Sequence, residues 1–470
     1  MYNSFSEIQA AIQNNETVEN IVNQYLDRIE KNRDLNAFLD VFDKTAIEKA
    51  KEVDEKIKSN KAGKLAGMVV GLKDNLCYKD HKVSASSKIL ENFQSIYSAT
   101  VVERLLAEDA IIIGRLNCDE FAMGSSNENS AFGAVKNAVD KSRVPGGSSG
   151  GSATAVAAKL CTVALGSDTG GSIRQPASFT GTVGLKPTYG RVSRYGLIAY
   201  ASSFDQIGPF SQNVEDAALV LEVISGEDEF DSTVSSKPTE KYSNFDDVKS
   251  LKIGFLNDCF NAEGLDEEIK EGTLKILDKL IAENHQVDKV SFEYIPYMVP
   301  TYYVLTTAEA SSNLARFDGV HYGHRSENAV GVEETYVKSR SEGFGDEVKR
   351  RIMTGTFVLS QGYYDAYYAK AQKVRRLIKN KTEKLLDEYD LLLLPTAPSV
   401  AFKKGAVKDN IQMYLQDIFT VQANLAGNPA ISLPLCENKE GLPFGIQLIG
   451  KRFGEKQLLS ASEYMMKLFK

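Results

Sequence analysis

Apolar positions follow two spacings along this chain, one typical of helices and one typical of strands. Between residues 18 and 29, apolar side chains recur about every 3.6 positions, which predicts an amphipathic helix with one buried face. Ser4 and Glu7 match a capping box and predict the start of an earlier helix. Further short apolar runs alternate with helical segments along the chain, which is typical of an α/β protein. These runs predict strands at residues 68–72, 110–114, 162–165, 251–255, 391–394 and 445–449.

Two further segments are distinguished by their side chains. Residues 153–160 are mostly small, which predicts a helix packed closely against the sheet. Residues 226–248 are polar and acidic, which predicts an excursion over the surface.

Two glycine- and serine-rich loops and a preceding lysine carry the candidate chemistry. Lys73 directly follows the first predicted strand, within GLKDN at residues 71–75. The loops are residues 144–152 (VPGGSSGGS) and 166–176 (GSDTGGSIRQP), and the second begins where another predicted strand ends. Open α/β sheets place their sites at such strand ends. Loops this rich in glycine turn sharply and present backbone amides beside serine hydroxyls, as acyl transfer requires.

Two other interpretations of these loops fail on residue identity. A phosphate-binding P-loop needs a lysine after its last glycine, but Ser152 and Ser172 occupy that position. A Ser-His-Asp hydrolase needs a histidine, yet neither loop contains one and no G-x-S-x-G motif occurs. A serine nucleophile would therefore use another base, and Lys73 is available, as in Ser-Lys variants of the triad.

Composition narrows the class of protein without assigning a function. The 470 residues carry a formal net charge of −8, which argues against a surface built mainly to hold nucleic acid. Five cysteines show no metal-binding spacing and are interpreted as reduced, mostly buried side chains. The N-terminus has no signal-peptide pattern, and no apolar run is long enough to cross a bilayer. We therefore expect a cytoplasmic protein with no metal site of its own.

The trio Lys73, Ser148 and Ser172, set in the runs 146–153 and 168–174, resembles the amidase signature family. Further segments resemble those members that serve as glutaminase subunits of tRNA-dependent amidotransferases, and the likeness extends to about residue 449. These segments are residues 119–124, 184–193 and 341–345.

The resemblance implies a single amidase domain over residues 1–470. Its fold would be α/β, with one large mixed, mostly parallel sheet wrapped by helices. Residues 1–60 would supply N-terminal helices, residues 65–225 the signature core, and residues 250–470 the rest of the sheet and the substrate pocket.

The resemblance also implies a mechanism. Ser172 would attack a side-chain amide, with a neutral Lys73 as base and Ser148 as proton relay. Burial would lower the pKa of Lys73 by desolvation, and Asp74 is expected to point away because its charge would oppose that shift. The resemblance also implies a cis peptide bond between Gly147 and Ser148. An oxyanion hole would be formed by the amides of Thr169, Gly170, Gly171 and Ser172.

Neighbouring residues have structural interpretations. Ser149 and Ser152 are expected to cap the helix that begins there. Asp168 and Arg174 are expected to pair and hold the shape of the second loop. Lys186 precedes a proline in what resembles a fixed turn. Packing is expected to explain four tyrosines at helical spacing: Tyr363, Tyr364, Tyr367 and Tyr368.

The resemblance implies that Tyr302, Arg351 and Asp417 bind the ends of free glutamine. An arginine can hold a carboxylate through two parallel N–H bonds, and an aspartate can pair with an ammonium. Arg350 is the alternative to Arg351, because the register differs by one residue.

The resemblance therefore implies a glutaminase subunit that passes ammonia to a tRNA-binding B subunit, in a heterotrimer completed by a small C subunit. The B subunit would convert Glu-tRNA(Gln) to Gln-tRNA(Gln) with ATP and magnesium, so no cofactor is expected in this chain. Use of Asp-tRNA(Asn) stays open. The alternatives are a free-standing amidase acting on small amides and an inactive scaffold subunit.

Overall fold

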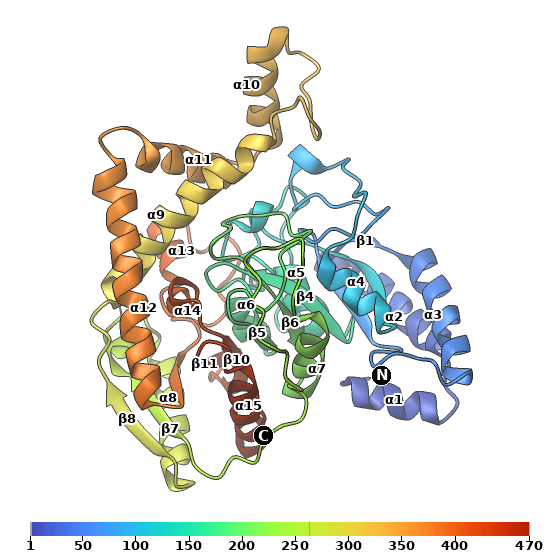
Figure 1. Ribbon diagram of the computed structural model, residues 1–470, viewed down its shortest axis with the longest axis vertical. Coiled ribbons are helices and arrows are strands. Elements are labelled where there is room, and N and C mark those ends of the chain that lie inside the picture. The colour runs from blue at the N-terminus through green and yellow to red at the C-terminus, as the bar shows by residue number, and fades with distance from the viewer. Residues whose placement is uncertain (1, 263, 470) are drawn as a thin grey trace.

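The computed structural model describes residues 2–262 and 264–469, and its centre is one sheet. Figure 1 shows the N-terminal helices at one end of this sheet and the long helix α12 at the opposite end. In sheet order, the strands of these residues are β1 (Phe38–Val41), β3 (Ile111–Leu116), β2 (Val69–Lys73), β4 (Val163–Asp168), β6 (Gln206–Ser211), β5 (Val183–Lys186), β10 (Ala430–Glu437), β11 (Pro443–Ile449), β9 (Leu391–Pro395), β7 (Lys252–Leu256) and β8 (Gln286–Val290).

Helices wrap the sheet, and α10 projects from the body of the molecule (Figure 1). No helix of the described residues is both long enough and apolar enough to span a membrane. The helices are α1 (Phe5–Gln13), α2 (Val18–Lys31), α3 (Asp43–Lys58), α4 (Thr100–Ala107), α5 (Gly150–Ala157), α6 (Arg174–Thr180), α7 (Val214–Ile224), α8 (Glu267–Ala282), α9 (Ile295–Asn313), α10 (Gly331–Gly343), α11 (Asp346–Leu359), α12 (Lys370–Glu388), α13 (Asn410–Leu415), α14 (Val421–Ala426) and α15 (Glu455–Phe469).

The amphipathic N-terminal helices are confirmed. The amide of Glu7 donates to Ser4 Oγ at 3.2 Å, so Ser4 caps α1 as predicted. Helix α2 buries the apolar face that its spacing predicts. Residues 226–248 form no regular element and are largely exposed, in agreement with the predicted surface excursion.

All six predicted strands are present, with ends that differ by a few residues. The sequence analysis missed β1, β5, β6, β8 and β10. Strand β8 is only partly buried at the edge of the sheet, so its polar residues give no apolar run. Strand β10 is interrupted by a register shift between Leu433 and Cys436, which obscures any alternation.

The sheet is mixed as expected, but the expectation that it is mostly parallel is wrong. Strand β2 is parallel to β3 and β4, and β7 is parallel to β8 and β9. The other six of the ten strand pairings in the described residues are antiparallel. The short connection 438–442 between β10 and β11 shows why, since a tight return can only produce antiparallel neighbours.

The parallel pair β2 and β4 brings the two motif regions together. Val70 is paired with Val163, and Leu72 with Leu165, so the ends of both strands meet at the same edge of the sheet. Helix α5 begins at this edge and is almost wholly buried. A Cβ at Gly151 would lie 2.3 Å from the carbonyl oxygen of Asn117, so only glycine permits this close approach.

Candidate active site

Lys73 is fully buried at the end of β2, where serine hydroxyls surround its amine. The Nζ atom donates to Ser148 Oγ at 2.7 Å, and to Ser149 Oγ and Ser167 Oγ at 2.9 Å each. Within the described residues, no carboxylate oxygen lies within 4.0 Å of Nζ. Burial lowers the pKa of Lys73 to about 8, because desolvation penalises the ammonium form.

Asp74, the next residue, points away from this cluster as predicted. Its carboxylate accepts from the amides of Ser84 and Ser86 and from Arg115 Nη1 at 2.9 Å. The carboxylate nearest in sequence is therefore neutralised elsewhere and does not hold a proton on Lys73.

The first loop turns at a cis peptide bond between Gly147 and Ser148, as the family resemblance implies. Asp119 is packed against this turn, since a Cβ at Gly147 would lie 2.1 Å from Asp119 Oδ2. The Asp119 amide donates to the carbonyl of Ser148 at 3.0 Å, and the carboxylate accepts from the amides of Asn127 and Asn129. Asp119 thus ties the loop to the segment 119–129.

The expected capping roles of Ser149 and Ser152 are wrong. Ser149 occupies the N-cap position of α5 but makes no capping bond; its hydroxyl donates to the carbonyl of Ser167 at 3.1 Å. Ser152 Oγ donates to the carbonyl of Leu165. The helix start is buried against β4, so both hydroxyls find partners on the strand and on Lys73 instead of on their own helix.

In the second loop, Asp168 and Arg174 form the structural pair that was predicted. Both are fully buried, with Arg174 Nη2 2.8 Å from Asp168 Oδ1. Burial alone would raise the pKa of Asp168, but the Arg174 guanidinium lowers it to about 2. Arg174 also donates to the carbonyl of Thr420 and to Asn424 Oδ1, which fixes the loop to α14.

Ser172 lies at the tip of this loop and is 8% exposed, whereas Lys73 and Ser148 are fully buried. Among the described residues, no group hydrogen-bonds to Ser172 Oγ. Its carbonyl accepts from the amide of Ser149 at 3.2 Å, which holds the two loops together. Ser172 is therefore the member of the trio that a substrate can reach.

The four expected oxyanion donors are reduced to three. The Gly171 amide donates to Asp168 Oδ1 at 2.9 Å and is thus already occupied. The amides of Thr169, Gly170 and Ser172 have no acceptor within the described residues. Gly171 has a φ of +132° and a Cβ there would lie 2.2 Å from Thr420 Oγ1, so glycine is required at this position.

Of the two candidate arginines, Arg351 faces the interior. It is 4% exposed, donates from Nε to Glu347 Oε1 at 2.8 Å and from Nη1 to the Tyr200 hydroxyl at 2.9 Å. The side chain of Arg350 is 45% exposed and pairs with Glu347 from the outside. Arg351 is thus the buried member of the pair, and its binding of a carboxylate stays a prediction.

Tyr303 contacts both Asp417 and Arg351. Its carboxylate accepts from Ser125 Oγ at 3.0 Å and from the Tyr303 hydroxyl at 3.1 Å. The Tyr303 ring centroid is 5.2 Å from the Arg351 guanidinium carbon. Burial raises the pKa of Asp417 to about 7.

Tyr302 lies against the second loop, because a Cβ at Gly170 would be 2.4 Å from its Cζ. The predicted substrate trio thus contacts the loop of Ser172 at one end. The sequence analysis missed Ser125, Tyr200, Tyr303 and Glu347, although Ser125 directly follows the run 119–124 and Tyr303 is adjacent to Tyr302.

Two of the remaining structural expectations have different outcomes. Lys186 is buried and donates to the carbonyl of Pro187 at 2.8 Å, in agreement with a structural role. Packing explains one member of the tyrosine run, because Tyr368 lies on a turn of π-helix and is partly buried against the core. Tyr363, Tyr364 and Tyr367 are 44–46% exposed and contact mainly one another, Tyr368 and Phe357, so packing in the core does not explain these three.

A family model described as Amidase matches residues 20–459. The chain therefore belongs to the amidase family, the class of protein that its sheet and its buried Lys-Ser-Ser cluster also indicate.

Its relatives are more specific. It is 52% identical to the A subunit of glutamyl-tRNA(Gln) amidotransferase from Fusobacterium nucleatum subsp. nucleatum, over 99% of this chain and 98% of that protein. It is 51% identical to the protein of the same name from Caldanaerobacter subterraneus subsp. tengcongensis, over 97% and 93%. The crystal structure of the A subunit of glutamyl-tRNA(Gln) amidotransferase from Thermotoga maritima matches with a TM-score of 0.77 and 41% identity, over 94% of this chain and 90% of that chain.

A more distant solved structure shares the fold. Native peptide amidase from Stenotrophomonas maltophilia matches with a TM-score of 0.83 at 27% identity, over 99% of this chain and 96% of that chain.

Proposed function

We propose that this chain is the glutamine-hydrolysing subunit of a tRNA-dependent amidotransferase and supplies ammonia for the conversion of Glu-tRNA(Gln) to Gln-tRNA(Gln). Relatives that carry this subunit's name at 51–52% identity over nearly their full length support the proposal. The observation that carries the chemistry is Lys73, which is buried among hydroxyls with its pKa lowered to about 8. Such an amine can accept a proton near neutral pH.

The hydrogen bonds around Lys73 support one orientation of the neutral amine. Ser149 Oγ donates a hydrogen bond to the carbonyl of Ser167, and Ser167 Oγ accepts one from Asn75 Nδ2 at 2.9 Å. A neutral amine has two N–H donors, and we propose that they go to these two hydroxyls. Its lone pair then faces Ser148 Oγ, 2.7 Å away. Lys73 is thereby set to take the proton of Ser148.

The proposed reaction passes this proton along the two serines. Ser148 gives its proton to Lys73 and takes the proton of Ser172, whose Oγ attacks the side-chain carbonyl carbon of glutamine. The amides of Thr169, Gly170 and Ser172 stabilise the oxyanion, and each such donor is typically worth about 10²–10³ in rate. The C–N bond breaks as Ser148 returns the proton to the leaving nitrogen, and ammonia departs. Water then hydrolyses the acyl-enzyme by the same route.

Binding of free glutamine is proposed for the Arg351 and Asp417 region. Arg351 offers a buried guanidinium to the α-carboxylate, and Asp417 offers a carboxylate to the α-ammonium. Because burial raises the pKa of an unoccupied Asp417, an arriving ammonium would favour its ionised form. Tyr302 would close the pocket beside the loop of Ser172.

The wider assembly is part of the same proposal. Ammonia would pass to a tRNA-binding B subunit that uses ATP and magnesium, with a small C subunit completing a cytoplasmic heterotrimer. Residues 1–470 would act as one amidase domain within it.

The test is ammonia release by the full-length chain co-expressed with its B and C subunits. Glutamine and propionamide are compared as substrates, with and without Glu-tRNA(Gln) and ATP. We expect glutamine to be preferred and its hydrolysis to depend on the subunits. Equal turnover of propionamide by the isolated chain would instead identify a free-standing amidase.

A further inference from the structure

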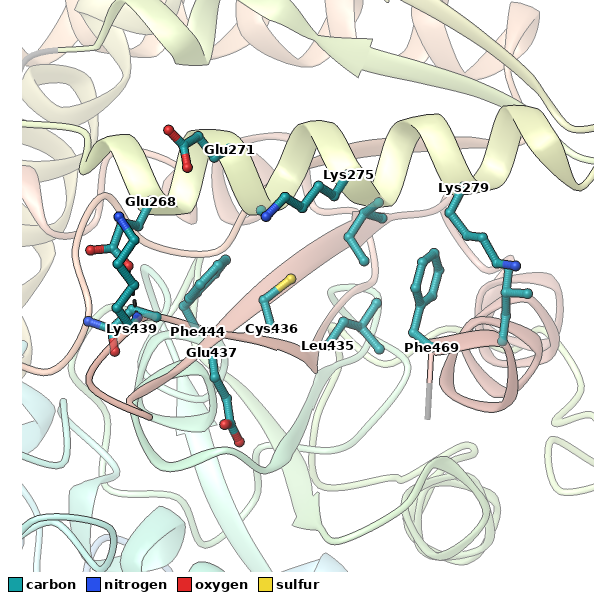
Figure 2. Close-up of a pocket in the computed structure, with 14 residues that line it drawn as sticks. Glu268, Glu271, Lys275, Lys279, Leu435, Cys436, Glu437, Lys439, Phe444 and Phe469 are labelled. Atoms are coloured by element: carbon teal, nitrogen blue, oxygen red, sulfur yellow. Dashed lines mark hydrogen bonds between the residues drawn. The ribbon is translucent and has the colours of Figure 1, made fainter.

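Two surface pockets away from the Lys73 cluster differ sharply in charge. The first, of about 580 Å³, lies between α8, β10 and α15. Figure 2 shows Glu268, Glu271, Lys275 and Lys279 along α8, above a floor that includes Phe444. Lys279 is 2.9 Å from Glu283. Cations and carboxylates thus occur together here, and the pocket has no overall preference for either sign.

The second pocket, of about 470 Å³, lies between α12, the end of α14 and Arg452. Its cations are Arg375, Arg376, Lys379 and Arg452, and no carboxylate is among its lining residues within the described chain. The chain as a whole has a formal net charge of −8. A wholly cationic pocket in an acidic protein therefore calls for a physical explanation.

The cations arise from the spacing of α12. Gln372, Arg375, Arg376 and Lys379 stand at positions i, i+3, i+4 and i+7, which places all four on one face of the helix. Like charges at this spacing repel one another and destabilise an isolated helix. The fourth cation, Arg452, comes from the loop after β11 and adds to this repulsion.

Only Arg375 has a clear structural role. Its Nε donates to the carbonyl of Leu425 at 3.1 Å, its Nη atoms donate to Ser203, and its guanidinium carbon lies 4.0 Å from the centroid of Phe204. Ser203 also donates its amide to Glu309 Oε2 at 2.8 Å, and the charge of this carboxylate partly compensates that of Arg375.

The other three cations are poorly neutralised within the described residues. No carboxylate lies within 4.0 Å of the nitrogens of Arg376 or Arg452. Arg452 Nε is buried without a hydrogen-bond partner, and it lies 3.7 Å from where a Cβ at Gly427 would stand, in the pocket wall. Lys379 has Glu383 at 3.7 Å, a distance at the limit of an ion pair.

We propose that this pocket binds phosphate groups. A single carboxylate carries one charge and would leave the pocket cationic, whereas a phosphate dianion or two linked phosphates match two cations without a carboxylate partner, Arg376 and Arg452, beside the weakly paired Lys379. Guanidinium groups hold phosphate oxygens through paired N–H bonds, and the buried Nε of Arg452 gains the acceptor that it lacks. The volume is in the range of about 300–1,000 Å³ typical of small-molecule pockets. The phosphates can belong to a free ligand or to an RNA backbone.

The test has two measurements on the full-length chain at low ionic strength. The first is calorimetric titration with pyrophosphate, and the second is binding of a fluorescein-labelled RNA stem-loop. The variants are Arg376→Gln and Lys379→Gln on the outer part of α12, and Arg452→Gln. The matched control is Lys373→Gln, which removes one charge from an exposed position of the same helix outside the pocket. Unfolding curves verify that each variant is folded.

We expect wild type to bind pyrophosphate, each pocket variant to lose at least about tenfold in affinity, and Lys373→Gln to stay within twofold. RNA binding weakened by the same variants and displaced by pyrophosphate would assign the site to a phosphate backbone; pyrophosphate binding alone would assign it to a free phosphate ligand. No binding of either probe, equal loss in the control, or tighter binding of a polyglutamate peptide would overturn the proposal.

Discussion

Lys73 and Arg174 are both fully buried cations of the candidate active site, but their surroundings are opposite. Arg174 lies 2.8 Å from the carboxylate of Asp168 and donates to further oxygens on α14 and β11. The Nζ atom of Lys73 is hydrogen-bonded to three serine hydroxyls and has no carboxylate in contact within the described residues. The charge of Arg174 is permanently compensated by a carboxylate, whereas an ammonium at Lys73 is only solvated by hydroxyl groups.

The difference separates a structural cation from a chemical one. A compensated guanidinium keeps its proton and holds a loop in place, while an uncompensated buried amine can lose its proton near neutral pH. Lys186 adds a condition: burial lowers its pKa to about 7, yet among the described residues its amine hydrogen-bonds only to the carbonyl of Pro187. A lowered pKa therefore suggests a base only where a hydroxyl lies in reach of the amine.

The largest expected effect is a loss of activity in the serine cluster around Lys73. Ser172→Ala should reduce glutamine hydrolysis by at least about 10³-fold, because no other hydroxyl of the cluster is exposed to substrate. Ammonia release from glutamine by the assembled complex measures this, with free ammonia as the alternative nitrogen donor. The thermal unfolding midpoint should be unchanged. Residual activity within tenfold of wild type would assign the nucleophile to another residue.

Breaking the compensated pair should instead lower stability. Asp168→Asn leaves the Arg174 guanidinium buried without a counter-charge, which typically costs about 3–5 kcal/mol. Urea unfolding of the full chain gives the free energy. Glu55→Gln, which breaks the exposed ion pair with Lys58, is the control and should leave stability unchanged. A variant as stable as wild type would mean that the pair does not hold the second loop.

Substitution of Arg351 tests whether this third buried cation binds the substrate. Arg351→Ala should raise the KM for glutamine about 100-fold, the order expected when a charged hydrogen-bonding partner is lost, and leave turnover of free ammonia unaltered. Arg350→Ala is the matched control, since its side chain is exposed and shares the same Glu347. Steady-state kinetics with both nitrogen donors distinguish the two. Equal losses with both donors would indicate damage to the fold.

The smallest expected effect concerns the stability cost of Lys73 itself. Its folded-state pKa of about 8 lies below the ordinary 10.5, so between these values the unfolded chain binds the extra proton and stability rises with pH. Below about pH 8 the loss of stability caused by burying Lys73 reaches its full size. Relative to wild type, Lys73→Met should therefore be more stable at pH 7.5 than at pH 9.5, by about 2 kcal/mol. Urea unfolding at both pH values measures this, and an equal difference at both would contradict a lowered pKa.

Much of this site could be predicted from the sequence because its parts are local. Lys73, Ser148 and Ser172 stand at ends of predicted strands or in glycine-rich turns, and the pairing of β2 with β4 unites them. The Asp168–Arg174 pair lies within a single loop. In each case, short-range spacing is enough to place the side chain.

The remaining features depend on contacts between distant segments. Tyr200, Tyr303 and Glu347 meet at Arg351 from separate elements, and Ser125 reaches Asp417 across 292 positions. No periodicity encodes such meetings. The capping error at Ser149 has the same origin, because its hydroxyl prefers the buried amine of Lys73 to its own helix.

The central claim is that Lys73 acts as a neutral base, and its most direct test is the rate of glutamine hydrolysis against pH for wild type and Lys73→Arg in the assembled complex. Deprotonation of Lys73 predicts a wild-type rate that rises with pH, is half-maximal near pH 8 and levels off about one pH unit above. Arginine keeps the charge but does not release its proton, so Lys73→Arg should be inactive at every pH while the complex still uses free ammonia. Substantial glutamine hydrolysis by Lys73→Arg, or a wild-type rate that is flat between pH 6 and 8, would contradict the account.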